Sequence, residues 1–571
     1  MSLRVWLPLT KDLKNQGLDD VTVTNNGATF NSTGKLGGCY YFNNAYAWLP
    51  MDYSTFGTEF SVAFWYKIDT AFSGNRHLVC LCNQYGWPQL KFTCAATSNS
   101  TLAFNIGDGS TSARSLSTSQ IIGSWQHICF TFNNKIAKVY VNGVQTGTAT
   151  YSINPDWSGT TKMGIGGVPD GHECAITLSL NDVRIYDHCL SPLEVKEISK
   201  GLILHYPLNR GGWGQENLIA GTDFNGSSKK YTITSGTEGG FFYTPTETIL
   251  ANTEYTVSCQ LRGNANMNLY KLCTGGNESI NWVNRSQLSI TEYKPFSITF
   301  TYPSSKTLNQ IYICTRYGTS NTSTGDWFEI KPNSLKLEKG SIATPWCPNS
   351  SDTLATAMEL NGNIEYDCSG YCNNGTRTGI FSWTSDTPKY EVSTNFSTIS
   401  QHVHLNYNTN GFKDSYSISL WLKYNSTQTN SAPEIFGIPA YACLYISGNL
   451  IYWNTNDGTN NPFKNNGSTL SITPYVNNWH HFVITGNGTN VILYIDGVKA
   501  GRATTYKHFG GNKIVLSDKD NTRNTYSFIG LVSDFRIYAT ALSAEDVKSF
   551  YNNSAYIDNQ GNIYGAVYEE V

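Results

Sequence analysis

The sequence predicts an all-β protein with about three domains, on the strength of its composition, its strand pattern and a duplicated segment. Only 14% of the 571 residues are charged and 13% are aromatic, while Gly (51) and Tyr (36) are plentiful, a mix that favours strands and turns. At roughly 150–200 residues per domain, the length suggests three domains. The stretch 125–150 recurs as 479–504 with 10 of 26 positions identical, which indicates a repeated unit.

The repeated stretch reads as two strands and the start of a third. Alternating apolar residues such as Ile128, Phe130 and Phe132 precede the pair Asn142-Gly143, which is typical of a type I′ turn because both central residues need positive φ. The same order of motifs surrounds both copies. FSVAFWYKI at 60–68 matches YSISLWLKY at 416–424, and DVRIY at 182–186 matches DFRIY at 534–538, each followed by a capped helix start at Ser191 or Ser543.

These motifs resemble the laminin-G-like modules of the concanavalin A-like lectin/glucanase superfamily, most closely those of phage tail and adhesion proteins. The resemblance covers residues 1–205 and 355–555 and implies jelly-roll β-sandwiches that bind ligands or act as spacers. It implies structural roles for Trp125, His127, Gly143, Asp182 and Arg184 and for their second copies, Trp479, His481, Gly497, Asp534 and Arg536.

Residues 213–348 lack the repeat motifs but contain their own strand series, and their end is similar to carbohydrate-binding-module-like jelly rolls of phage tail proteins. The segment 201–209 looks like the start of a second laminin-G-like unit, whose continuation appears only at 360–376. We therefore expect the middle sandwich to be inserted near the start of the second unit. Residues 556–571 are expected to form a short strand pair.

Composition and motifs exclude several function classes. The net charge is −3 without a basic footprint, which argues against nucleic-acid binding. No apolar run is long enough to span a membrane, and the N-terminus predicts no signal peptide. We expect a virion protein made in the bacterial cytoplasm, with bacterial surface polysaccharide or other virion proteins as partners. Sandwich edges need covering, so a homo-oligomer is also considered.

A sugar site needs an exposed aromatic face beside hydrogen-bonding groups. The candidates are Trp282, Trp327, Tyr317 and Trp213 in the middle segment, and Trp87 and Trp453 in the flanking units. Calcium is the ion considered, with oxygen ligands from Asp367 or from Asp518 and Asp520.

The expected function is non-enzymatic adhesion through glycan binding. A glycosidase needs two carboxylates flanking the cleaved bond, and Asp326 with Glu329 or Glu365 with Asp367 occupy ordinary strand and turn contexts. The alternatives are a polysaccharide-degrading enzyme with accessory lectin domains and a purely structural virion decoration protein.

Overall fold

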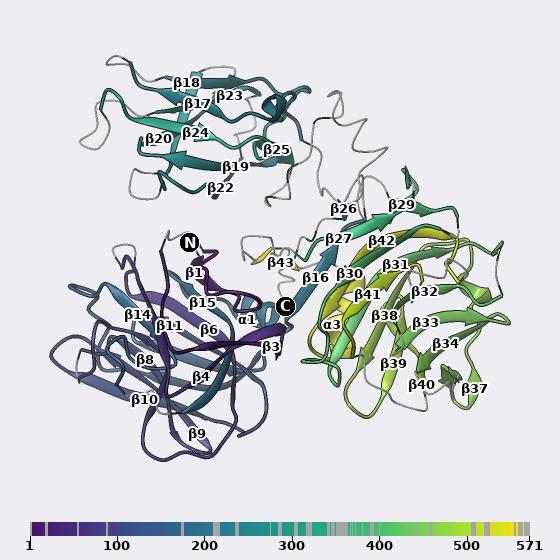
Figure 1. The fold of residues 1–571 in the computed structure, drawn as a ribbon, viewed down its shortest axis with the longest axis horizontal. Coiled ribbons are helices and arrows are strands. Elements are labelled where there is room, and N and C mark those ends of the chain that lie inside the picture. Colours follow the sequence, from purple (N-terminus) through teal and green to yellow (C-terminus); the bar gives the residue numbers. More distant parts are fainter. Residues whose placement is uncertain are drawn as a thin grey trace.

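The fold comes from a computed structural model of the full chain (Figure 1). It describes residues 3–564 apart from 18–20, 54–55, 87–88, 173–175, 209–216, 235–238, 274–275, 284–287, 302–306, 316–322, 340–342, 344–345, 347–348, 350–363, 366, 368, 370, 372, 380, 389–392, 399, 430, 440–441, 456–459, 504–509, 519–525, 553–555 and 558–562. Strands dominate these residues, as the sequence predicts.

The first repeat (residues 3–200) is a sandwich of two antiparallel sheets with an apolar core between them. Its eight-stranded sheet contains β1 (Leu3–Leu7), β3 (Thr29–Gly34), β4 (Gly37–Asn43), β6 (Glu59–Ile68), β11 (Gln126–Asn133), β12 (Ile136–Val141), β13 (Val144–Thr150) and β15 (Thr177–Tyr186). Its seven-stranded sheet contains β2 (Thr24–Asn26), β5 (Tyr46–Pro50), β7 (Arg76–Leu81), β8 (Phe92–Ser98), β9 (Thr101–Gly107), β10 (Ser112–Ser119) and β14 (Lys162–Ile165). Helix α1 (Pro192–Ser199) packs beside β11.

The second repeat (residues 202–206 and 364–552) has the same arrangement. Its larger sheet contains β16 (Leu202–Tyr206), β28 (Ser382–Thr384), β29 (Ser393–Phe396), β31 (Tyr416–Tyr424), β36 (Lys464–Asn465), β37 (Ser468–Thr469), β38 (His480–Gly486), β39 (Val491–Ile495), β40 (Val498–Ala503) and β42 (Gly530–Tyr538). The facing sheet contains β26 (Ile364–Glu365), β27 (Gly375–Thr378), β30 (His402–Asn406), β32 (Glu434–Ile438), β33 (Ala442–Ser447), β34 (Leu450–Thr455), β35 (Asn460–Pro462) and β41 (Lys513–Leu516). Helix α3 (Ala544–Asn552) occupies the place of α1.

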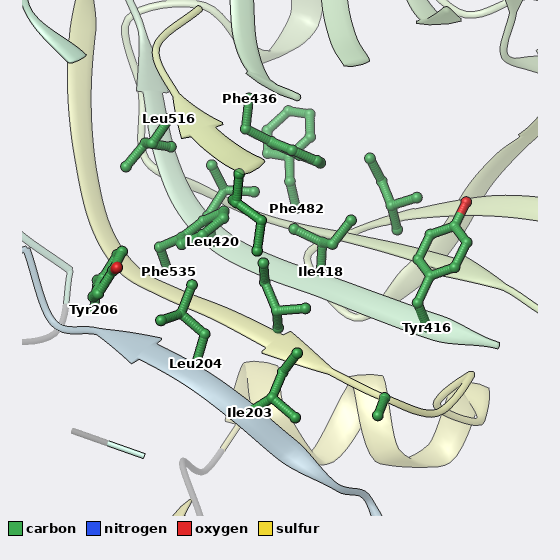
Figure 2. Close-up of a cluster of buried hydrophobic side chains, with 14 of the residues drawn as sticks. Ile203, Leu204, Tyr206, Tyr416, Ile418, Leu420, Phe436, Phe482, Leu516 and Phe535 are labelled. Atoms are coloured by element: carbon green, nitrogen blue, oxygen red, sulfur yellow. The ribbon is translucent and has the colours of Figure 1, made fainter. Parts of the chain in front are cut away.

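Strand β16 precedes the middle segment in sequence but lies in the sheet of the second repeat. It pairs antiparallel with β42, as β1 pairs with β15 in the first repeat. Figure 2 shows Ile203, Leu204 and Tyr206 directed into the same core as Leu420 and Phe535. The strand that opens the second repeat is therefore separated from the rest of that repeat by the middle segment.

The middle unit (residues 217–349) is a smaller antiparallel sandwich with its own core. One sheet contains β17 (Lys229–Thr232), β19 (Glu254–Gly263), β22 (Lys294–Thr301), β24 (Trp327–Ile330) and β25 (Lys336–Lys339). The other contains β18 (Gly240–Tyr243), β20 (Met267–Cys273), β21 (Gly276–Val283) and β23 (Leu308–Thr315). Near the C-terminus, β43 (Tyr556–Ile557) pairs with β44 (Ile563–Tyr564).

The turns and helix caps predicted from the sequence are confirmed. Asn142 and Gly143 both have positive φ, as do Asp496 and Gly497 in the second copy. In each copy the side chain of the first turn residue also accepts a hydrogen bond from the backbone N–H of a histidine two strands earlier, from His127 of β11 at 2.8 Å and from His481 of β38 at 2.9 Å. Asn and Asp both tolerate positive φ and both have a side-chain oxygen that accepts this bond, which fits their presence before Gly in the two copies.

Both C-terminal helices begin with reciprocal caps. The Ser191 hydroxyl accepts from Glu194 N–H while the Glu194 carboxylate accepts from Ser191 N–H, and Ser543 with Asp546 repeats this exchange. Among the described helices, none has the length and apolar character needed to cross a membrane.

Candidate functional site

An aromatic row crosses the four-stranded sheet of the middle unit. The register places Phe242 of β18 opposite Tyr312 of β23, and Tyr312 opposite Tyr270 of β20. The Phe242 and Tyr312 rings are parallel within 4° with centroids 3.9 Å apart, and Tyr270 follows at 6.0 Å. Three adjacent strands thus contribute one continuous stack of rings, an arrangement that cross-strand aromatic pairing favours.

The row stands upright on the side of the sheet that faces away from the core. Neighbouring residues Ile311 and Ile313 are buried, so the alternation of β23 sends Tyr312 outward. Phe242 is 54% exposed because β18 is the edge strand of this sheet, with β23 as its neighbour. One face of the Phe242 ring stacks on Tyr312, which leaves the other toward the sheet edge.

Polar groups flank the open end of the row. Thr244, which directly follows β18, is exposed, and its hydroxyl accepts a hydrogen bond from the Gln310 side-chain amide at 3.2 Å. An exposed aromatic face beside an amide and a hydroxyl is the combination that sugar binding requires. Sequence reasoning missed this row, because it searched for aromatic residues outside the strand pattern.

The structure places the aromatic candidates chosen from the sequence in different surroundings. Trp453 is fully buried beside Tyr416 and Phe436, so the expectation of an exposed platform there is wrong. Trp327 is half-buried, and the Lys230 ammonium lies 4.1 Å from its ring centroid. Trp282 lies in β21, but the structure does not describe its side chain. Tyr317, Trp213 and Trp87 lie outside the described residues.

Asp367 does not have the free oxygens that a calcium ligand needs. Its carboxylate accepts hydrogen bonds from the backbone N–H groups of His205, Ser369 and Asn373, each at 2.9 Å, and from the Ser369 hydroxyl at 2.6 Å. These donors use the lone pairs of the carboxylate to tie β16 to the second repeat, which argues against a calcium ligand here, and calcium at Asp367 stays a prediction.

Asp518 is buried and Asp520 lies outside the described residues, so a calcium site at this turn stays a prediction. Within the described residues, no cluster of three or more His, Cys, Asp or Glu side chains could hold a metal ion.

The carboxylates considered for glycosidic chemistry are held by hydrogen bonds within the fold. Glu329 accepts from Arg262 Nε at 2.6 Å, and this pairing keeps its pKa below the usual value despite partial burial. Asp326 accepts from the Asn264 amide at 2.9 Å and from Ser323 N–H at 2.7 Å. Glu365 is fully buried and accepts from Arg377 Nε at 2.7 Å. Each of these carboxylates joins neighbouring strands or turns.

The motif residues shared by the two repeats form matching buried clusters. In the first repeat, the Asp182 carboxylate accepts from Trp6 Nε1 at 2.7 Å and from Arg184 Nε at 2.9 Å. In the second, Asp534 accepts from Arg536 Nε at 2.8 Å and lies 2.9 Å from His205 Nε2. Position for position, β16 supplies His205 where β1 supplies Trp6. These clusters hold the opening strand of each repeat against its neighbour, β1 against β15 and β16 against β42.

The shared histidines are also internal. Burial lowers the pKa of His127 to about 3, so its ring is neutral at physiological pH. His481 Nε2 lies 2.8 Å from the Ser419 hydroxyl, a partner that the first repeat replaces with Ala63. The structural role expected for both histidines fits these surroundings.

Comparison with solved structures finds distant likenesses. Domain 4 of AbnA, an extracellular arabinanase from Geobacillus stearothermophilus solved with arabinotriose, is 20% identical with a TM-score of 0.26, covering 32% of this chain and 91% of that one. Trypanosoma rangeli sialidase is 14% identical with a TM-score of 0.27, covering 34% of this chain and only 32% of that chain. The receptor-binding domain of botulinum neurotoxin type G is 13% identical with a TM-score of 0.28, covering 59% and 81%. No curated protein sequence matches significantly.

A family profile matches both repeats. The concanavalin A-like lectin/glucanases superfamily profile matches residues 43–196 and again residues 396–548. The two matched segments contain the strand–turn–strand motifs, the Asp-x-Arg clusters and most of the two sandwich cores described above. Since they cover more than half of the sequence, this chain belongs to the concanavalin A-like lectin/glucanases superfamily.

Proposed function

We propose that this chain is a non-enzymatic adhesion protein of a bacteriophage, or of a related tail-like particle, that binds host surface glycans. The observation that supports this most directly is the aromatic row of Phe242, Tyr312 and Tyr270, with Thr244 and Gln310 beside it. A sugar ring would pack its apolar face on the open face of Phe242 and exchange hydrogen bonds with the flanking hydroxyl and amide.

The non-enzymatic part of the proposal has its own support. The carboxylates at Asp326, Glu329 and Glu365 are each committed to hydrogen bonds within the fold. A retaining or inverting glycosidase needs two carboxyl groups about 5–10 Å apart across an accessible sugar. The virion assignment is supported by the resemblance of both sandwich types to phage tail modules.

The aromatic row can be tested by retention on immobilised bacterial surface polysaccharides. Covering about 100 Å² of apolar ring surface at about 25 cal/mol per Å² is worth about 2.5 kcal/mol before the costs of binding. We therefore expect Phe242→Ala and Tyr312→Ala each to weaken retention about tenfold or more. Phe30→Ala is the matched control, because Phe30 is similarly exposed (45%) and packs on Tyr40 in the first repeat.

Two results would contradict the proposal. Retention that Phe242→Ala and Tyr312→Ala leave unchanged would exclude the aromatic row as the sugar site. Release of reducing ends from capsule or cell-wall polysaccharide would favour an enzyme. The virion part is tested separately by particles that lack the protein, which should adsorb poorly to their host.

A further inference from the structure

A cleft of about 850 Å³ lies between the two repeats, within the size range of small-molecule sites. The first repeat contributes Trp125, the turn at 142–144 and helix α1, and the second contributes residues 414–415 and 540–546. The cleft is separate from the aromatic row, which lies in the middle unit.

Direct contacts hold the walls of the cleft together. The Lys196 ammonium lies 2.8 Å from the Asp546 carboxylate, and the Thr540 hydroxyl donates to Lys200 C=O at 2.8 Å. Beside them, the Tyr407 hydroxyl of the second repeat donates to Leu36 C=O at 2.6 Å. The cleft is thus built by contacts that cross between the repeats.

Lys35 is the unusual residue of this lining. It lies in the turn between β3 and β4 and is only 7% exposed. Among the described residues its ammonium has no hydrogen bond and no carboxylate partner, and it lies 5.1 Å from the centroid of the Trp65 ring. The cleft's other lysines are paired, Lys196 with Asp546 and Lys200 with Glu197. The Trp65 ring is a cation–π partner for this ammonium, but a largely buried ammonium without a carboxylate still carries a desolvation cost that an anionic ligand would offset.

The Trp65 side chain lies beside this ammonium on the lining of the cleft. Trp65 is almost fully buried, and its indole N–H finds no acceptor among the described residues. The Lys35 ammonium on the cleft calls for an anionic oxygen acceptor. The acidic residues Asp414 and Glu545 on the opposite wall would repel a doubly charged phosphate more strongly than a single carboxylate, which favours the carboxylate.

The geometry points to the cleft as a binding site for an acidic sugar, whose carboxylate pairs with the Lys35 ammonium. The half-buried Trp125 ring and the hydroxyls of Ser124 and Ser415 offer the stacking and hydrogen-bonding groups that the rest of the sugar needs. The choice of a sugar over another carboxylate rests on the proposed function. Burial lowers the pKa of Lys35 to about 8, so the ammonium is mostly charged at pH 7.

Calorimetric titration of the full chain with acidic monosaccharides and their methyl esters tests this inference, because each pair differs only in the charge. The probes are methyl glucuronide, methyl galacturonide and N-acetylneuraminic acid. We expect at least one acid to bind about tenfold or more tightly than its ester, and Lys35→Met to remove that preference. Lys11→Met, which changes an exposed lysine of the same repeat, should leave it unchanged.

A second measurement checks the site without a variant. The preferred acid should slow acetylation of Lys35, followed by mass spectrometry, without slowing that of Lys11. Equal binding of every acid and its ester, or a preference that Lys35→Met retains, would overturn the inference. Acetate that protects Lys35 as well as the sugar at equal concentration would overturn the sugar assignment.

The result stays distinct from that of the proposed function. Phe242→Ala should leave the preference for the acid unchanged, because Phe242 lies in the middle unit. A chain that retains polysaccharide through the aromatic row but shows no preference for acids would refute only the cleft. A chain that prefers the acid but retains polysaccharide equally well after Phe242→Ala would refute only the aromatic row.

Discussion

Replacing Lys35 with methionine should stabilise the first repeat while removing a ligand-binding charge. The methionine side chain is of similar length and fills the same space against Trp65 without an ammonium to desolvate. At 7% exposure and without a carboxylate partner, the Lys35 ammonium costs the fold a desolvation penalty that an anionic ligand would offset. The variant therefore separates a residue kept for binding from one kept for stability.

The magnitude follows from the pKa of the ammonium. Burial lowers it from 10.5 to about 8, and at about 1.4 kcal/mol per pKa unit the charged form costs the fold about 3 kcal/mol at pH 7. Between pH 8 and 10.5 the folded protein has released a proton that the unfolded chain still holds. The stability of the wild type therefore rises with pH through this window, and below pH 8 the full cost remains. Lys35→Met should gain about 1–3 kcal/mol at pH 7 and nothing near pH 10.5.

The assay must report on the first repeat alone, because a 571-residue chain of several sandwiches does not unfold in two states. Samples are equilibrated in urea at pH 7 and pH 10, then pulse-labelled with deuterium at one common pH. Peptides from β6 and β11 give the unfolding midpoint by mass spectrometry, and Lys11→Met is the control. A variant that is no more stable than the wild type at pH 7, or a gain of equal size at pH 10, would refute the reasoning.

Two further predictions use the repeat as its own control. Ser419→Ala should destabilise the second repeat by about 1–2 kcal/mol, because His481 loses its hydroxyl partner. Ala63→Ser should stabilise the first repeat by up to about 1 kcal/mol, because it gives His127 the equivalent hydroxyl. Segment-resolved urea unfolding measures both changes, and a stabilising Ser419→Ala would contradict the role of the hydroxyl. Gly143→Ala should lower the stability of the protein more than Gly497→Ala, although both glycines have positive φ. A Cβ at Gly143 would lie 2.3 Å from Ser199 Oγ, while the nearest atom to a Cβ at Gly497 is 3.2 Å away. Thermal unfolding of the two variants checks this order, and equal losses of stability would show that φ alone sets the loss.

Local sequence patterns predicted the local structure well. Asn142-Gly143 determines its turn because few residue pairs tolerate positive φ twice, and Ser191 with Glu194 determines a helix start through two reciprocal hydrogen bonds. Both signals act within four residues, so no tertiary information is needed to read them.

The candidate site could not be predicted in the same way. Tyr312 alternates with Ile311 and Ile313, which indicates an outward side chain, but its neighbours Phe242 and Tyr270 come from strands that are 70 and 42 positions away. Their stacking depends on strand order in the sheet, β18-β23-β20, which the sequence does not state. Trp453 shows the converse failure, because an aromatic residue near polar neighbours in sequence is fully buried in space.

One connection that the two repeats share differs in how its charged residue is paired. The β3–β4 connection of the first repeat corresponds to the β28–β29 connection of the second, since both lead to the strand beside β15 or β42. In the second repeat this connection brings the Asp386 carboxylate to Trp479 Nε1 at 2.7 Å and to the Lys423 ammonium at 2.5 Å, and the pairing holds its pKa below the usual value. In the first repeat the same connection brings Lys35 into the cleft beside Trp125, where its ammonium lies over the Trp65 ring and has no carboxylate partner among the described residues. Asp386 thus has its charged partner within the second repeat, whereas Lys35 has no carboxylate partner among the described residues, and an anionic ligand in the cleft is the partner that we expect for it.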